Sequence, residues 1–224
     1  MTEKTVALVR HGHSQHNPER GAFLGGLSWL SKLFHPDTCL TDVGQQQAKD
    51  LHEQLTGDPK HPLNSVEVII TSPLSRCIQT TLLVFGDTGI PPRVVSAAHT
   101  ERCVFPCDTG RSPEELVTSF PALRNYAGFG ELSDVWWPQD EDRGILNEVH
   151  PVDRVDAFKR MLLQRDEEKI AVVGHSGFFK LLTGKKMDNC EVLWMRLCAD
   201  ASVQLLAEPP AEPLAESPVE PPVE

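Results

Sequence analysis

The sequence TVALV at residues 5–9, followed at once by RHG at residues 10–12, decides the fold. A second segment has the same design, with IAVV at residues 170–173 and GHSG at residues 174–177. A short apolar run bounded by turn residues predicts a buried strand, so each segment places a histidine just past a strand. Because ligands of parallel α/β sheets bind outside the carboxyl ends of the strands, we expect His11 and His175 to share one crevice.

Short apolar runs alternate with helical patterns along the rest of the chain. Further strands are predicted at Val66–Thr71, Arg93–Val95 and Ser202–Leu206. One helix is predicted to run from its cap at Thr41 to Gly57, and another to span Asp153–Arg165. This alternation is typical of α/β proteins, and it predicts a three-layer α/β/α sandwich with a mostly parallel central sheet.

The clearest helix follows Ser72-Pro73, which we interpret as its cap and first-turn proline. Its apolar stripe runs from Leu74 to Phe85, and Gly86 ends it. Arg76 then lies in the first turn, where the helix dipole disfavours a cation by roughly 0.3–1 kcal/mol. Such a conflict is expected at a functional site, where a bound anion offsets it.

Four nitrogen-bearing side chains converge at one edge of this predicted sheet. Arg10 and His11 follow the first strand, Arg76 follows the second, and His175 follows the fourth. Two guanidiniums and two imidazoles, without an evident cluster of carboxylates, suit the oxygens of a phosphoryl group. One imidazole can attack phosphorus while the other groups stabilise the negative charge, so the pattern predicts phosphoryl transfer through a covalent histidine intermediate.

The bulk composition fits one globular domain followed by an acidic tail. The chain has 224 residues, of which 40% are hydrophobic and 24% are charged. Residues 1–206 are predicted to form the domain, and residues 207–224, rich in Pro and Glu, a disordered tail. The net charge of −11, to which the five tail glutamates contribute, argues against nucleic acid or an anionic membrane as a partner.

The sequence also predicts a cytoplasmic protein without a metal or an organic cofactor. It contains no run of about 18 apolar residues, and the run Val6–Val9 is too short for a signal peptide. Cys103 and Cys107 lack a second pair at zinc-finger spacing, and reduced thiols are expected. The His-x-His-x-x-His pattern at residues 11–16 carries Gln15 where zinc-dependent hydrolases of the metallo-β-lactamase type have Asp.

The motifs resemble, in order, the signature segments of the histidine phosphatase (phosphoglycerate mutase-like) superfamily. The likeness covers RHGHSQHN at residues 10–17, LTDVGQQQA at 40–48, SPLSR at 72–76 with Thr80, Glu101-Arg102, and GHSG at 174–177. It spans most of the predicted domain. The resemblance implies a phosphoglycerate mutase-like fold and an acid-phosphatase-like enzyme of the phosphatase-type branch, which hydrolyses small phosphate monoesters.

Individual roles follow from the same resemblance. It implies that His11 becomes phosphorylated and that Arg10, Arg76 and His175 bind the phosphoryl oxygens. Substrate contacts are also predicted for other positions of these motifs, namely Ser14, Asn17, Arg102 and Ser176. The hydroxyl of Ser176 is in addition the expected cap of the helix that follows it.

The proton donor and the exact reaction type have alternatives. Glu101 matches the carboxyl that protonates the leaving alkoxide and later activates water, and Asp108 is the alternative acid. Mutase-type transfer is less well supported, because Cys103-Val104 follows Glu101-Arg102 where the mutases have Tyr-Gly. A protein that binds phosphorylated ligands without turnover is the alternative from another class.

Several further residues are interpreted as structural. His13 is expected to be an exposed flanking side chain. The histidines outside the two motifs are expected on the surface or in loops, namely His35, His52, His61, His99 and His150. Trp136-Trp137 either covers the pocket or packs in the core. Substrate choice is assigned to Gly21–Pro36 and Arg111–Val149, and the sequence names neither the substrate nor the oligomeric state.

Overall fold

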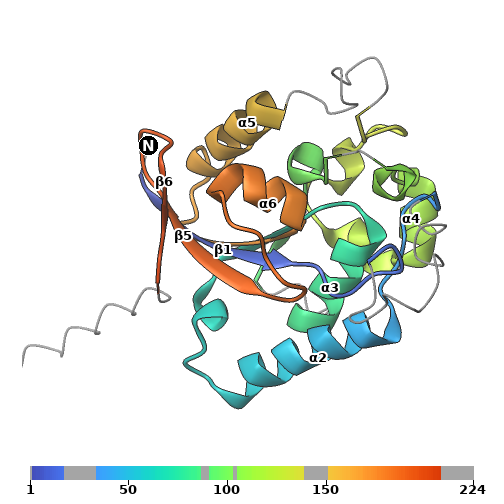
Figure 1. Ribbon diagram of the computed structural model, residues 1–224, viewed down its shortest axis with the longest axis horizontal. Helices are drawn as coiled ribbons and strands as arrows, with labels where there is room; N and C mark the ends of the chain where they lie inside the picture. Colours follow the sequence, from blue (N-terminus) through green and yellow to red (C-terminus); the bar gives the residue numbers. More distant parts are fainter. Residues whose placement is uncertain (1, 18–33, 87–90, 103–104, 139–150, 208–224) are drawn as a thin grey trace, which may run out of the picture.

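The computed structural model describes residues 2–17, 34–86, 91–102, 105–138 and 151–207, which form a layered α/β structure (Figure 1). At its centre is a six-stranded sheet with the order β3-β2-β4-β1-β5-β6. The strands are β1 (Lys4–Arg10), β2 (Val68–Thr71), β3 (Arg93–Val95), β4 (Lys169–Gly174), β5 (Val192–Leu197) and β6 (Val203–Leu205).

The sheet is mostly parallel, as predicted. Strands β1, β2, β3 and β4 pair in parallel, whereas β5 is antiparallel to its neighbours β1 and β6. The register of β1 and β4 places Arg10 opposite Gly174. The segments after these two strands, each of which begins with a predicted catalytic histidine, therefore leave the sheet side by side.

Helices cover both faces of the sheet (Figure 1). On one face lie α2 (Asp42–Gly57) and α3 (Ser75–Phe85), and on the other α5 (Pro151–Leu163) and α6 (Ser176–Thr183). Helix α4 (Pro113–Ser119) packs beside α3. The short 3-10 turns are η1 (Pro62–Ser65), η2 (Ala97–His99), η3 (Pro106–Asp108), η4 (Pro121–Asn125) and η5 (Phe129–Glu131).

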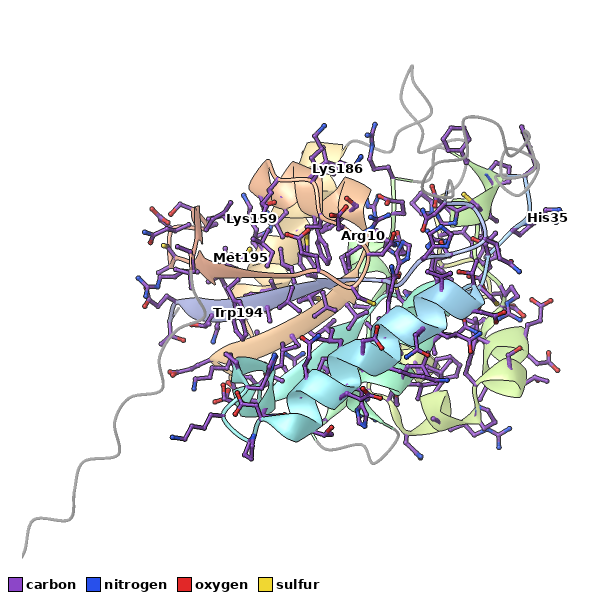
Figure 2. The ribbon with its side chains drawn as sticks, turned by 60° about the horizontal axis from the view of Figure 1, so that its bottom comes forward. Arg10, His35, Lys159, Lys186, Trp194 and Met195 are labelled. Carbon is purple, nitrogen blue, oxygen red and sulfur yellow. The ribbon has the colours of Figure 1, made fainter. Side chains whose placement is uncertain are left out.

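The alternation of side chains along the strands builds the two apolar layers. In β1, Val6 and Leu8 pack in the cluster with α5 and α6, while Val9 belongs to the cluster with α2 and α3. In β5, Trp194 and Met195 belong to opposite clusters in the same way (Figure 2). A strand that is buried on both faces needs apolar side chains at successive positions, one for each face. The two apolar layers, each covered by helices, confirm the predicted three-layer α/β/α architecture.

Two helix predictions are confirmed with small changes at the ends. The side chain of Thr41 accepts a hydrogen bond from the backbone of Gly44 and caps α2, which ends at Gly57 as expected. Helix α5 ends at Leu163 rather than at Arg165. The apolar positions predicted to face the core are buried in both helices, namely Ala48, Leu51 and Leu55 in α2 and Val155, Phe158 and Leu162 in α5.

Strand β5 was not predicted. Its sequence VLWMRL is rich in Leu and Met, which favour helices by intrinsic propensity. The strand forms because it pairs along its whole length with β1, from Val192 opposite Val9 to Leu197 opposite Lys4. Tertiary pairing therefore overrides local preference at this position.

The structure does not test the predictions for two parts of the chain. The acidic tail from residue 208 onward lies outside the described residues, as does His150. None of the helices in the described ranges has both the length and the apolar character needed to cross a membrane.

Candidate active site

The two predicted histidines meet at the carboxyl edge of β1 and β4. The backbone N–H of His11 donates to the carbonyl of Gly174 at 3.0 Å. The ring centroids of His11 and His175 are 5.3 Å apart, and both side chains are buried. The prediction that the two segments share one crevice is therefore supported by the geometry.

The hydrogen bonding of His11 selects one tautomer. Its Nδ1 lies 2.7 Å from the carbonyl oxygen of Gly12, which can only accept, so Nδ1 carries the proton. Burial, together with the charges of Arg76 and Arg10, holds the pKa of His11 well below its usual range. The imidazole is therefore neutral, and its Nε2 carries a free lone pair.

Close backbone packing holds the RHG turn in place. A side chain on Gly12 would collide with the backbone of Gly44, and one on Gly44 would collide with the backbone of His13. The N–H of Gly12 donates to the hydroxyl of Thr80 in α3 at 3.1 Å. These contacts explain why glycines stand at both positions, and they fix His11 relative to α2 and α3.

Arg76 is fully buried at the start of α3. Its Nη1 donates to the carbonyl of Cys107 at 2.8 Å, and its Nη2 pairs with Asp108 Oδ1 at 2.9 Å. Burial alone would lower the pKa of Arg76, but Asp108 and the other acidic groups around the guanidinium together raise it. Its buried Nε has no hydrogen-bond partner among the described residues.

Arg10 likewise has one nitrogen that forms a hydrogen bond and one that has no partner among the described residues. It lies where β1 ends (Figure 2), and its Nη1 donates to the carbonyl of Met187 at 2.9 Å. Its buried Nε also lacks a partner within the described part of the chain. Burial lowers the pKa of Arg10, although the charges of Glu101 and Asp188 oppose that shift. Two buried N–H donors without partners, on guanidiniums whose charges act on His11, indicate an anion site.

His175 has contacts with two side chains besides the ring of His11. Its Nε2 lies 2.9 Å from the hydroxyl of Ser72 and 3.4 Å from the sulfur of Cys77. Burial and the charge of Arg76 keep the pKa of His175 well below its usual range. Ser72 therefore positions His175, and its predicted role as the cap of α3 is wrong, because that helix begins at Ser75 without a side-chain cap.

Glu101 binds the amino-terminal end of α6. Its carboxylate accepts hydrogen bonds from the backbone N–H groups of Gly177 at 3.1 Å and Phe178 at 3.0 Å, and from that of Arg102 at 3.0 Å. Burial and the nearby charge of Asp108 nevertheless raise the pKa of Glu101, against the opposing effect of Arg76. A side chain on Gly177 would overlap Oε1 of Glu101, which explains the second glycine of the GHSG motif.

Asp108 occupies a different position from Glu101. It ends η3, its side chain is almost fully buried, and it forms the ion pair with Arg76. Burial raises the pKa of Asp108 above its usual value, although the charge and hydrogen bond of Arg76 oppose that shift. The two candidate acids therefore lie around the same guanidinium, but only Asp108 pairs with it at hydrogen-bond distance among the contacts described here.

Ser14 and Asn17 form a polar turn next to His11. Both the N–H and the hydroxyl of Ser14 donate to Asn17 Oδ1 at 3.0 Å. Asn189, from the loop between α6 and β5, donates through Nδ2 to the carbonyl of His11 at 3.0 Å. Sequence reasoning missed Asn189, because no pattern within its loop indicates that the loop reaches the site.

The remaining predicted substrate residues have structural contacts. The hydroxyl of Ser176 donates to the carbonyl of Met187 and accepts from its N–H, both at 3.2 Å, so it joins α6 to the next loop and does not cap the helix. The backbone of Arg102 binds Glu101. Trp136 packs in the core near α3 and α4, and its indole N–H donates to the carbonyl of Arg111 at 2.8 Å, which favours the packing interpretation.

Three histidines that were not predicted to take part in the site lie elsewhere than expected or close to His11. His99 lies in the short turn η2, but it is fully buried and donates from Nε2 to the carbonyl of Val173 at 3.1 Å, so a surface position is wrong for it. His13 is half-buried, with Nδ1 2.9 Å from the hydroxyl of Thr41, rather than exposed. His16 was not assigned a role, yet its ring centroid is 6.0 Å from that of His11.

A sequence profile of the histidine phosphatase superfamily, branch 1, matches residues 6–208. The chain belongs to this superfamily. All the residues that carry its predicted phosphoryl chemistry lie within the matched span. In the described part of this histidine phosphatase chain, no group of three or more His, Cys, Asp or Glu side chains is arranged to hold a metal ion.

Relatives of known sequence or structure cover most of the chain. A phosphoglycerate mutase-like protein from Arabidopsis thaliana is 32% identical over 219 residues, which is 85% of this chain and 78% of the relative. Phosphoglycerate mutase-like protein 1 from the same plant is 29% identical, covering 78% of this chain and 69% of that protein. The solved phosphoserine phosphatase of Entamoeba histolytica superposes with a TM-score of 0.53 at 17% identity, over 92% of this chain and 96% of that one, and so shares its fold.

Proposed function

We propose that this histidine phosphatase superfamily member is a phosphomonoesterase that hydrolyses small phosphate esters through a phosphohistidine on Nε2 of His11. The observation that carries the proposal is the environment of His11. The carbonyl of Gly12 fixes the proton on Nδ1, and the two guanidiniums whose charges act on the ring each have a buried Nε–H without a partner among the described residues. A neutral nucleophile next to two anion-binding donors suits attack on a phosphoryl group.

In the first step, the Nε2 lone pair attacks phosphorus. A P–N bond forms as the P–O bond to the alcohol breaks, and the leaving oxygen receives a proton. Arg10, Arg76 and His175 bind the three phosphoryl oxygens, where negative charge is concentrated in the transition state. The Nδ1–H bond to Gly12 stabilises the positive charge that develops on the ring of His11.

In the second step, water replaces the histidine. The carboxylate that gave up its proton removes one from the attacking water, the P–N bond breaks, and inorganic phosphate leaves. His11 returns to its neutral form with the proton on Nδ1. The residues of this chain therefore supply the nucleophile, the anion site and the acid–base group.

We assign the acid–base role to Glu101 rather than to Asp108. The ion pair with Arg76 favours the ionised form of Asp108, and this negative charge favours a proton on Glu101. After Glu101 donates that proton, the N–H groups of Gly177 and Phe178 stabilise the resulting carboxylate at the positive end of α6. Substrate phosphate, which is also anionic, would raise the pKa of Glu101 further.

The comparisons support a small phosphate ester as the substrate class. The fold neighbour from Entamoeba histolytica is a phosphoserine phosphatase that was solved with phosphoserine. The plant relatives are named as phosphoglycerate mutase-like proteins, which favours phosphoryl transfer between positions of phosphoglycerate as a second candidate function.

Hydrolysis of p-nitrophenyl phosphate with EDTA present tests the proposal. The wild-type protein should turn over, and His11→Ala should lower kcat/KM by about 10³-fold or more because the nucleophile is lost. Glu53→Ala, at an exposed position of α2 outside the predicted site, is the control and should behave as wild type. Turnover that survives in His11→Ala would overturn the nucleophile assignment. Conversion of 3-phosphoglycerate without phosphate release would favour the mutase function instead.

A further inference from the structure

His16 flanks the nucleophile but has no part in the mechanism above. Its ring is tilted by 54° to that of His11, at a centroid distance of 6.0 Å. His175 contacts His11 with a centroid distance of 5.3 Å. The nucleophile therefore has two imidazole neighbours, and the proposed mechanism uses only one of them.

The contacts of His16 leave one ring nitrogen available. Its Nδ1 lies 2.7 Å from the hydroxyl of Thr38 and 3.1 Å from that of Ser14. The hydroxyl of Ser14 already donates to Asn17, so Thr38 is the hydroxyl that can donate to Nδ1. With Nδ1 accepting, the proton of the ring lies on Nε2, which has no hydrogen-bond partner in the described part of the chain.

The electrostatic surroundings keep His16 neutral. Burial, followed by the charges of Arg76 and Arg10, lowers the pKa of His16 to about 2. The influence of both guanidiniums also shows that the ring lies within the field of the same anion site. At working pH, His16 can thus contribute one neutral N–H donor but no positive charge.

We propose that His16 is a further substrate-binding residue, which donates its Nε2–H to the phosphoryl group bound at His11, with Thr38 as the residue that fixes its tautomer. This inference rests on the proposed function, because it assumes that a phosphoryl group occupies the site. Phosphoryl oxygens accept hydrogen bonds and would repel a lone pair on Nε2, so bound phosphate itself favours the Nε2–H tautomer.

Variants of His16 can separate the two ring nitrogens. Gln places a polar atom near the position of Nε2, whereas Asn places one near Nδ1, and Phe keeps the ring without either nitrogen. The probes are orthovanadate and inorganic phosphate as competitive inhibitors of p-nitrophenyl phosphate hydrolysis. His16→Phe and His16→Asn should weaken both inhibitors by about tenfold to a hundredfold, as expected for a hydrogen bond to a charged group. His16→Gln should stay within about threefold of wild type, because it retains the donor near Nε2.

Thr38 provides an independent pair of variants. Thr38→Val keeps the shape of this buried side chain but removes the donor to Nδ1, and it should weaken vanadate in the same direction as His16→Phe. Thr38→Ser retains the hydroxyl and should rescue binding. Thermal unfolding of each variant checks that it is folded. If His16→Phe does not fold, the Gln and Asn variants of His16 and the Val and Ser variants of Thr38 still test the inference.

The outcomes distinguish this inference from the proposed function. If wild type is active and His11→Ala is not, but His16→Asn binds vanadate as wild type while His16→Gln does not, His16 acts only through Nδ1 and the inference is wrong. Vanadate affinity equal to that of wild type in all the His16 variants would also overturn the inference. An inactive wild-type protein, in contrast, would contradict the proposed function itself.

Discussion

At the scale of single residues, the environment of Arg76 contains two carboxyl groups, one buried and one half-buried, that differ in their partners. Asp108 pairs directly with the guanidinium, while Glu101 accepts backbone hydrogen bonds from the start of α6. When two carboxyl groups interact, the one with the better cationic partner ionises first, and its charge favours a proton on the other. The ion pair therefore assigns different roles to two chemically similar side chains.

Glu101→Gln should affect substrates according to their leaving groups. An alkyl phosphate such as glycerol phosphate needs a proton on the departing oxygen, so its kcat/KM should fall by about 10²–10⁴-fold. p-Nitrophenolate leaves without a proton, so kcat/KM for p-nitrophenyl phosphate, which reports formation of the phosphohistidine and not its hydrolysis, should fall much less. Steady-state kinetics with the two substrates measure this difference.

Asp108→Asn is the matched comparison. It removes the charge beside Arg76 and, with it, part of the support for the proton on Glu101, so it should lower kcat/KM for both substrates, with a smaller difference between them than Glu101→Gln causes. If instead Asp108→Asn is selective for the alkyl phosphate and Glu101→Gln is not, the two roles must be exchanged.

Gly177→Ala should move Glu101 without unfolding the protein. The new methyl group would overlap the carboxylate of Glu101, which is the mobile end of a side chain and can shift. We expect selective loss of alkyl phosphate hydrolysis and a nearly unchanged thermal midpoint. Gly57→Ala is the control, since a side chain there meets nothing within 4 Å. A fully active Gly177→Ala would show that the contact between Glu101 and α6 is not needed.

The residues of the site were predictable to different degrees. His11 and His175 follow apolar runs whose parallel pairing could be expected, so their proximity follows from the sequence. The role of Ser72 as a partner of His175 could not be foreseen, because Ser-Pro also fits a helix start. Asn189 and His99 reach their positions through tertiary packing alone, and no local pattern indicates it.

At the scale of elements, η2 carries a histidine into the layer formed by α5 and α6. The ring of His99 lies 5.0 Å from that of Phe158 and 6.3 Å from that of Phe178. Its Nδ1 is buried without a hydrogen-bond partner among the described residues. Burial lowers the pKa of His99 to about 4, so the packing of η2 depends on a neutral imidazole.

Acid should therefore weaken the fold through His99. In the unfolded chain His99 binds a proton below about pH 6.5, but in the folded protein it does so only below about pH 4. The free energy of unfolding that depends on the neutral ring is therefore present at pH 7 and is lost as the pH falls through this range. The contribution is on the order of 2–3 kcal/mol between pH 7 and pH 4.5. Urea unfolding at both pH values should show a smaller pH effect for His99→Leu than for wild type. Equal pH effects would contradict this prediction.

Element prediction succeeded where local signals agree with tertiary structure. β1, β4 and α2 combine apolar patterns with clear ends, and the structure has them at nearly the expected residues. The sequence analysis missed β5 because its strand-favouring residues Val192 and Trp194 are mixed with Leu and Met, which favour helices, and because its strand conformation depends on pairing with β1. Pairing between distant segments is the information that the sequence alone does not display.

At the scale of the whole molecule, the described core ends with β6 and the residue after it. Leu206 packs against the cluster that contains α2 and α3, and its N–H donates to the carbonyl of Trp194 at 3.0 Å. We propose that residues 1–206 form the catalytic domain and that the acidic segment beyond it is dispensable for folding. Removing the five tail glutamates changes the net charge from −11 to −11 + 5 = −6.

A chain truncated after Ala207 should keep its thermal midpoint within about 2 °C and its kcat/KM for p-nitrophenyl phosphate, because surface changes away from packed features have small effects. A chain truncated after Asp200 is the comparison, since it loses β6 and should unfold at a clearly lower temperature. Calorimetry and steady-state kinetics measure both. Marked destabilisation of the longer chain would show that the acidic segment belongs to the folded domain.

The direction of β5 has a consequence for how specificity can evolve. In a fully parallel sheet, only loops that follow strands reach the ligand edge. Because β5 is antiparallel, its first residue Val192 pairs with Val9 near that edge, and residues 184–191 are delivered there as well. Met187 and Asn189 already contact Arg10 and His11 from this loop. Exchanging the other residues of the loop between relatives is thus a route to new selectivity that leaves the pairing of the sheet intact.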